Sequence, residues 1–302
     1  MLNFKLLGTA AGGGVPQWNC VCPICDLCRK NPEIVRPRSQ LQAAFSSDGE
    51  KWFLINASPD LRSQIEANSE LQPLALHSMR NTPIQGIILT SADLDQVLGL
   101  LLLREFQPLT VYATALVRRT LEANSFFRML ERVPDHLTWV QIEPGKTFIL
   151  GDRVRCTPIP ISGSLPYYAQ ELDSPNKPEQ AVIGLLLEAE ECRLAYTPSV
   201  PEITDSLRSV YSSCDVILVD GTFWSDAELN QTHAGTPLAH SIGHISMSGD
   251  NGTIALLADV TRPLKVFVHI NNTNPVLDLR SPEYQSVIDA GWQIGEDGWR
   301  LN

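Results

Sequence analysis

The sequence predicts an α/β protein with two β-sheets, and three observations lead to this fold class. Segments with strand character are mixed with segments with helical character along the 302 residues. The two halves of the chain repeat a similar progression, in which a β-hairpin precedes helical segments. Short, continuous apolar runs at 86–90 and 216–220 are typical of strands buried on both faces. The length and the 43% hydrophobic content suffice for one large domain or two closely merged halves.

The N-terminal half supplies the first set of elements. A strand at 4–7 opens into a glycine-rich loop at 8–14, and two alternating segments at 39–46 and 51–56 form a hairpin around the turn 47–50. Periodicity and composition then predict a helix at 62–66, a strand at 86–90, a Leu-rich helix at 97–104, a strand at 110–113, a helix at 115–130 and a strand at 135–141.

The C-terminal half repeats strands and helices in a similar order. We expect strands at 148–154 and 154–161, a second hairpin from 181–188 and 193–197, and a buried strand at 216–220. A helix at 253–257, the last core strand at 265–268, a helix at 281–290 and a short polar hairpin complete the chain.

Composition and charge exclude several functions. The formal net charge of −11 makes nucleic acid an unexpected partner. No run approaches the roughly 20 apolar residues that a membrane span needs. The N-terminus lacks the basic-then-apolar pattern of a secretory signal, so we expect a cytoplasmic protein.

Four of the seven cysteines lie within nine residues, which in a reducing compartment indicates a metal site. Cys20, Cys22 and Cys25 form a C-x-C-x-x-C knuckle that can present three thiolates to one structural zinc ion. The alternative is a set of buried or idle thiols. Two residues compete as the fourth ligand, Cys28 and His269. We predict His269, because a bond from the knuckle to the last core strand would fasten the N-terminal loop to the domain.

Acidic side chains follow two predicted buried strands. Ser91, Asp93, Asp95 and Gln96 stand where the strand at 86–90 passes into a helix, and ligands collect at the carboxyl ends of strands in α/β folds. The two carboxylates predict a site for a metal or a cationic group, although Asp95 alone would also suit a helix N-terminus. Asp220 ends the strand at 216–220, where it either faces a cleft or caps the turn before Gly221.

The residues 91–96 resemble the first metal-binding motif of the metallo-β-lactamase superfamily, His-x-His-x-Asp-His, which follows a buried strand and precedes a Gly-containing helix. Only Asp95 is kept, since Ser91, Asp93 and Gln96 replace the three histidines, and this departure disfavours a dinuclear zinc hydrolase. With LGLLLLRE after it, the altered motif is similar to the branch that takes part in making pyrroloquinoline quinone (PQQ). The resemblance implies a four-layer αββα sandwich with two mixed sheets, as a single metallo-β-lactamase-like domain over residues 1–302.

The resemblance also implies an activity, the iron-dependent hydroxylation of the tyrosine ring in a cross-linked Glu–Tyr precursor excised from a peptide. Such chemistry needs an iron(II) site with positions left open for oxygen and substrate. The alternative is a non-catalytic carrier that binds PQQ or its precursor and assists its transport. A homodimer is compatible with either function. The candidate iron ligands implied are Asp93, Asp220 and His269. Asp95 would either be a further ligand or hydrogen-bond to a ligand, and Gln96 would orient Asp95. His244 would shuttle a proton or bind a carboxylate of the substrate.

The pair His240 and His244 adds one further expectation. Residues four apart would bind a common metal on a helix, but Gly243 and the neighbouring serines predict a loop here. We interpret His240 as structural, unless His240 or His244 joins the iron ligands. The stretch GHISMSG around His244 resembles the segment in which relatives place a substrate-facing histidine.

Overall fold

The computed structural model describes residues 2–74, 78–105, 107–151, 153–169, 178–190, 192–231 and 236–301. The chain folds into two compact units, each built from segments that are distant in sequence. Unit 1 comprises Met1–Leu7, Leu41–Glu191 and Gly298–Asn302, and unit 2 comprises Gly8–Gln40 and Cys192–Asp297. The described strands form two seven-stranded sheets, as the predicted α/β class requires. A single domain over residues 1–302 remains a prediction.

Unit 1 contains one complete mixed sheet. Its strand order is β14-β1-β2-β3-β4-β5-β6, in which β2 and β3 form the predicted antiparallel hairpin and β3 to β6 run parallel. The strands are β1 (Asn3–Gly8), β2 (Gln42–Ser46), β3 (Trp52–Ile55), β4 (Ile84–Ile88), β5 (Leu109–Ala113), β6 (Leu137–Gln141) and β14 (Arg300–Leu301). The unit also holds the antiparallel strands β7 (Phe148–Leu150), β8 (Val154–Ile161) and β9 (Val182–Ala189).

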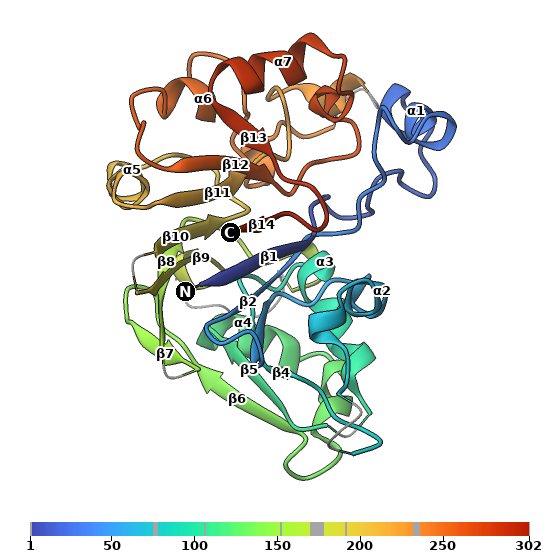
Figure 1. The fold of residues 1–302 in the computed structure, drawn as a ribbon, viewed down its shortest axis with the longest axis vertical. Helices are drawn as coiled ribbons and strands as arrows, with labels where there is room; N and C mark the ends of the chain where they lie inside the picture. Colours follow the sequence, from blue (N-terminus) through green and yellow to red (C-terminus); the bar gives the residue numbers. More distant parts are fainter. Residues whose placement is uncertain are drawn as a thin grey trace. The chain divides into compact units, whose positions relative to one another are not determined.

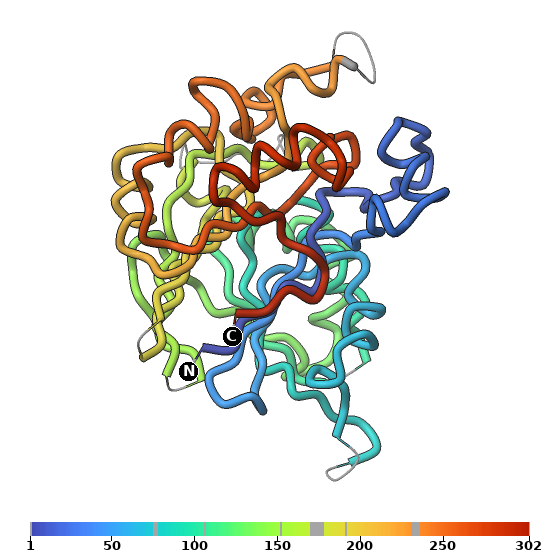
Figure 2. Tube along the Cα trace, turned by 45° about the horizontal axis from the view of Figure 1, so that its top comes forward, coloured from blue at the N-terminus to red at the C-terminus, as the bar shows by residue number. Residues whose placement is uncertain are grey.

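The two chain ends lie side by side in unit 1, because β14 pairs antiparallel with β1 and Leu301 lies opposite Phe4 (Figures 1 and 2). The predicted polar hairpin at the C-terminus is therefore wrong. In unit 2 the other strand of that segment, β13 (Trp292–Ile294), runs parallel to β12 (Leu264–Val268). Trp292 explains why β13 pairs with β12 and not with β14. Its buried ring stacks on Phe267 with ring centroids 4.2 Å apart, and this apolar burial stabilises the fold more than a local hairpin turn would.

Two predicted helices of unit 1 are interrupted. The Leu-rich run forms α3 (Leu94–Val97) and then a 3-10 helix (Leu98–Leu103), because the amide of Gly99 donates to the carbonyl of Ala57, at 2.8 Å, instead of to a helical carbonyl. A Cβ at Gly99 would lie 2.3 Å from the carbonyl oxygen of Ser58, so only glycine permits this approach.

The second interrupted helix is α4 (Ala115–Glu122), which is followed by a 3-10 helix (Phe127–Glu131). Here the side chain of Asn124 accepts a hydrogen bond from the amide of Phe126 at 3.0 Å, an Asx turn that competes with the helix. The other helical segments of unit 1 are α2 (Leu61–Glu66) and the 3-10 turns Ser69–Leu71, Tyr167–Ala169 and Pro178–Gln180. No helix in the described part of the chain is long and apolar enough to cross a membrane.

Unit 2 is built on four parallel strands, β10 (Cys192–Thr197), β11 (Val216–Asp220), β12 and β13. Figure 1 shows α6 (Thr253–Leu256) and α7 (Pro282–Asp289) beside β12 and β13. The remaining helical segments are α1 (Pro23–Lys30), α5 (Asp205–Ser212) and the 3-10 turns Glu228–Gln231, His240–Ile242 and Pro275–Leu277. The helix α5 was not predicted, although the hydroxyl of Thr204 caps it by accepting from the amide of Leu207.

The register of unit 2 brings two predicted site residues to the same edge. Asp220, the last residue of β11, pairs with Val268, the last residue of β12. His269 follows directly, so both side chains leave the sheet at the carboxyl ends of neighbouring parallel strands. Such an edge is where ligands bind in α/β folds.

Candidate metal centres

Three cysteines of unit 2 form the first candidate centre, which we call the cysteine cluster (Cys20, Cys22 and Cys25). Their sulfur atoms all lie within 4.8 Å of one another, a spacing suited to one metal ion. The start of α1 produces this arrangement, because Cys22 is the N-cap residue and its sulfur accepts from the amide of Cys25 at 3.5 Å. Burial raises the pKa of Cys22 to about 12. A metal that binds here must therefore displace a proton from that thiol.

Asn272 lies next to the cysteine cluster. Its side-chain amide lies 3.3 Å from the sulfur of Cys20, 3.3 Å from that of Cys25 and 3.8 Å from that of Cys22. The side chain is buried, and the two ends of a carboxamide are interchanged by a simple flip that turns the oxygen toward a metal.

The two residues considered from the sequence as the fourth zinc ligand, His269 and Cys28, lie outside the cysteine cluster. His269 lies in a different cluster, described below, and Cys28 is buried on α1 outside the three-cysteine group found among the described residues. The loop after β12 explains the difference: three residues past His269 it carries Asn272 to the cysteines.

The second candidate centre of unit 2 is the histidine cluster (Asp220, His244 and His269), whose ligand atoms also lie within 4.8 Å of one another. Nδ1 of His244 lies 2.7 Å from Oδ2 of Asp220, and Asp220 is fully buried. The two imidazole rings are 5.2 Å apart between centroids. His269 has φ of 60°, a conformation that costs free energy outside glycine and that concentrates at functional sites.

Thr222 joins this cluster, although sequence analysis did not single it out. Its hydroxyl lies 2.6 Å from Oδ1 of Asp220, 2.9 Å from Nδ1 of His269 and 3.1 Å from Nδ1 of His244. The sequence signal for Thr222 was its position two residues after Asp220 at the end of a strand. The same pattern is common in turns, so it does not by itself predict a functional site.

His240 lies apart from the histidine cluster. Its ring is exposed, and Nδ1 lies 2.9 Å from Asp226. Partners of Asp226, above all His240, lower the pKa of that carboxyl although burial opposes the shift. The structure therefore brings His244 to Asp220 and His269 and leaves His240 hydrogen-bonded to Asp226 at the surface.

The predicted strand-end residues of unit 1 also contact one another. The hydroxyl of Ser91 donates to Oδ2 of Asp93 at 2.6 Å and lies 3.1 Å from the side-chain oxygen of Gln96. Gln96 and Ser91 are buried, whereas Asp93 and Asp95 are partly exposed. Asp95 stands in the first turn of α3, as the helix-terminus interpretation predicts. The side-chain oxygen of Gln96 therefore accepts from the hydroxyl groups of both Ser91 and Thr90, the latter at 2.6 Å. That Gln96 orients Asp95 stays a prediction.

The chain is similar to known proteins over its whole length. A family model described as a beta-lactamase superfamily domain matches residues 51–270. Coenzyme PQQ synthesis protein B of Methylobacterium radiotolerans is 41% identical over the full length of both chains, and that of Gluconacetobacter diazotrophicus is 38% identical over 100% of this chain and 99% of its own. The chain belongs to the coenzyme PQQ synthesis protein B family.

Solved structures confirm the predicted fold class of this family member. The crystal structure of Zn(2+)-bound PqqB from Methylobacterium extorquens matches with a TM-score of 0.92 and 40% identity over 99% of each chain. A diphosphatase of the PhnP family matches with a TM-score of 0.69 at 19% identity, covering 99% of this chain and 96% of its own, and so shares the fold. The metallo-β-lactamase fold with two mixed sheets and flanking helices is therefore shown.

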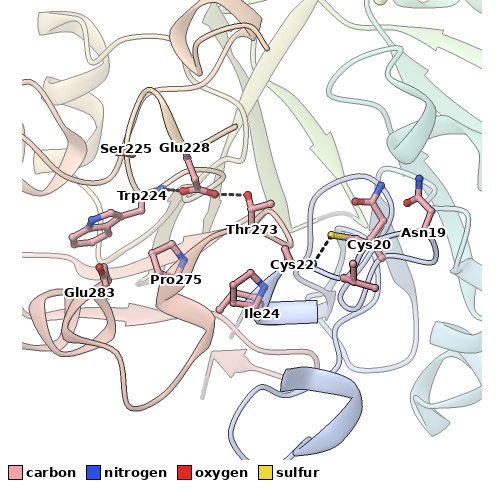
Figure 3. A pocket seen from close by; sticks show the side chains of 13 residues that line it. Asn19, Cys20, Cys22, Ile24, Trp224, Ser225, Glu228, Thr273, Pro275 and Glu283 are labelled. Carbon is pink, nitrogen blue, oxygen red and sulfur yellow. Dashed lines mark hydrogen bonds between the residues drawn. The ribbon is translucent and has the colours of Figure 1, made fainter. Parts of the chain in front are cut away.

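A pocket of about 960 Å³ borders the cysteine cluster within unit 2 and is lined in part by Cys20, Cys22, Trp224 and Thr273. Figure 3 shows the carboxyl group of Glu228 between Trp224 and Thr273. It accepts from the amide of Trp224 at 2.6 Å and from the hydroxyl of Thr273 at 2.5 Å. Glu228 thereby fastens the loop after β11 to the loop that carries His269 and Asn272, a role that no sequence pattern indicated.

Burial gives Glu228 a measurable effect on stability. It raises the pKa of this carboxyl to about 7, so the folded chain holds a proton that the unfolded chain releases at lower pH. The stabilising contribution of the protonated acid is complete below the unfolded pKa and is lost as the pH rises through about 7. We expect Glu228→Gln, which stays uncharged at every pH, to be more stable than wild type by up to about 3 kcal/mol near pH 9 and equally stable near pH 4.

Denaturant unfolding of both proteins across this pH range measures the difference. Glu283→Gln is the matched control, because Glu283 lines the same pocket but is partly exposed. A constant difference between wild type and Glu228→Gln at every pH would contradict the expectation.

Proposed function

We propose that this chain acts in PQQ biosynthesis as an iron-dependent oxygenase that hydroxylates the tyrosine ring of a cross-linked Glu–Tyr precursor. Membership in the coenzyme PQQ synthesis protein B family supports the biosynthetic role. The observation that carries the oxygenase assignment is the histidine cluster, in which two imidazoles meet at a buried carboxylate. Imidazole and carboxylate are the donors that non-haem iron(II) uses when open positions remain for oxygen.

The residues of the histidine cluster fit iron by the chemistry of their donors. His244 and His269 would supply imidazole nitrogens. Bound iron would supply the activation of dioxygen. The chain itself holds both imidazoles in place. Nδ1 of His244 lies 2.7 Å from Oδ2 of Asp220, and Nδ1 of His269 lies 2.9 Å from the hydroxyl of Thr222. His244 is also suited to carry a proton or bind a substrate carboxylate.

The cysteine cluster fits a structural zinc ion. Zinc held by the three thiolates and by the oxygen of the neighbouring Asn272 carboxamide would have no open position for chemistry. The zinc-bound state named for the Methylobacterium extorquens protein supports the same metal here. Zinc in this position would join α1 to the loop that carries His269.

A second candidate function is a carrier for PQQ or its precursor that assists transport. The hydrogen bonds among Ser91, Asp93 and Gln96 favour it, since this strand end has polar side chains bonded to each other where the superfamily places histidines. A carrier would bind the small molecule without changing it.

Product mass separates the two functions. The chain is reconstituted with iron(II) under anaerobic conditions, mixed with the cross-linked Glu–Tyr compound and exposed to oxygen. An oxygenase yields product that has gained oxygen only when both iron and oxygen are present, whereas a carrier returns the compound unchanged. Unchanged compound in the iron-loaded sample, together with measurable binding, would establish the carrier.

Asp93 offers a mutational test of the same function. We expect Asp93→Ala to abolish turnover, by more than about 100-fold, because loss of a ligand exceeds the 10–100-fold typical of residues that only orient one. Zinc content should not change, since Asp93 belongs to unit 1 and the cysteine cluster to unit 2. Glu50→Ala removes an exposed acid from the hairpin turn of the same unit and serves as the control. Wild-type turnover in Asp93→Ala would favour the carrier.

A further inference from the structure

The hydrogen bonds of Asp220 occupy its carboxylate. Oδ1 accepts from the amide of Thr222 at 3.0 Å and from the hydroxyl of Thr222 at 2.6 Å. Oδ2 accepts from the amide of Val200 at 2.9 Å and faces Nδ1 of His244 at 2.7 Å. An ionised carboxylate has about four lone-pair sites, so these partners account for its accepting capacity. Because Asp220 is fully buried, a metal bound to it would have to displace one of these bonds without help from water.

The same bonds determine where the protons of the cluster lie. Thr222 has one hydroxyl proton, and the 2.6 Å contact to a carboxylate oxygen that cannot donate assigns that proton to Asp220. The hydroxyl oxygen then acts as an acceptor toward Nδ1 of His269 at 2.9 Å, so that this nitrogen carries the ring proton. Nδ1 of His244 faces two acceptors, Asp220 and Thr222, and carries a proton for the same reason.

We infer that Thr222 and Asp220 are positioning residues that fix His269 and His244 as Nδ1–H tautomers, which makes Nε2 of each ring the metal-binding atom. A neutral imidazole has one lone-pair nitrogen, and the hydrogen bond at the other nitrogen decides which it is. Asp220 thus orients the two imidazoles and is not itself an iron ligand. The inference rests on the proposed function for the identity of the metal, but the proton positions do not depend on it.

The test begins with the metal-free histidine cluster of the zinc-loaded full chain. Long-range proton–nitrogen correlation spectra of protein with 15N-labelled histidine identify which ring nitrogen carries the proton. His244→Gln and His269→Gln assign the signals, and the spectra are recorded at a pH of about 8. We expect Nδ1–H for both residues. A proton on Nε2 of His269 in the wild-type protein overturns the inference, whether or not any variant folds.

Two substitutions at Thr222 test its role. Thr222→Val removes the hydroxyl and keeps the branched shape, whereas Thr222→Ser keeps the hydroxyl. We expect Thr222→Val to redistribute the proton of His269 and to weaken cobalt(II) binding at the histidine cluster by about 10–100-fold, and Thr222→Ser to restore both. Cobalt(II) affinity equal to wild type in a folded Thr222→Val protein overturns the inference. If the tautomers are as expected but the precursor gains no oxygen, the positioning role stands and the oxygenase function fails.

Discussion

Cys22→Ser should yield protein without zinc and with much lower stability. Cys22 provides one of three clustered sulfurs and also begins α1 as its N-cap residue. A hydroxyl does not replace a thiolate as a zinc ligand, so the linkage between zinc binding and folding is lost. At a free zinc concentration about a thousandfold above Kd this linkage contributes about 4 kcal/mol. Metal analysis and denaturant unfolding of wild type and variant measure the two effects.

Cys28→Ala is the matched control for this experiment. Cys28 lies on the same helix and is buried, but it does not belong to the cysteine cluster. We expect the control to retain about one zinc per chain. Zinc-loaded and equally stable Cys22→Ser protein would contradict the structural zinc, and loss of zinc from Cys28→Ala would return Cys28 to the ligand set. X-ray absorption on the wild-type zinc should show three sulfur neighbours.

His269→Ala should separate the two metal centres. The ring of His269 contacts Thr222 and lies beside His244, whereas Asn272 is the residue of the same loop that contacts the cysteines. We therefore expect the variant to keep its zinc and to lose iron binding and turnover, by more than about 100-fold, since even residues that only orient a ligand cost about 10–100-fold. Metal analysis after iron reconstitution measures the zinc and iron contents, and product mass measures turnover.

His240→Ala controls for the removal of an imidazole from the same unit. His240 is exposed and paired with Asp226, so its loss should change neither metal content nor turnover. Loss of zinc from His269→Ala would restore the ligand set that the sequence predicted, with His269 at the cysteines. Asn272→Ala would complete that comparison, because it should weaken zinc binding only if Asn272 fills the fourth position.

The local features of this protein could be read from short stretches of sequence. The spacing of Cys20, Cys22 and Cys25 determines that three sulfurs meet, because few backbone angles separate them. The apolar run before Asp220 determines a buried strand, and the structure gives β11 the predicted bounds. Helix ends were harder to predict from the sequence. The helix is interrupted at Gly99 because the amide of Gly99 donates to the carbonyl of Ala57, which is distant in sequence.

The partners of the site residues were decided by tertiary structure alone. His269 meets Thr222 across 47 residues of sequence, and Asn272 meets Cys22 across 250. No periodicity specifies such pairs, because the register between β11 and β12 and the path of the following loop determine which side chain reaches which cluster. From sequence, His269 could serve either centre. The parallel pairing of Asp220 with Val268 places His269 beside Asp220 and His244. Three residues later, the same loop brings Asn272 to the cysteines.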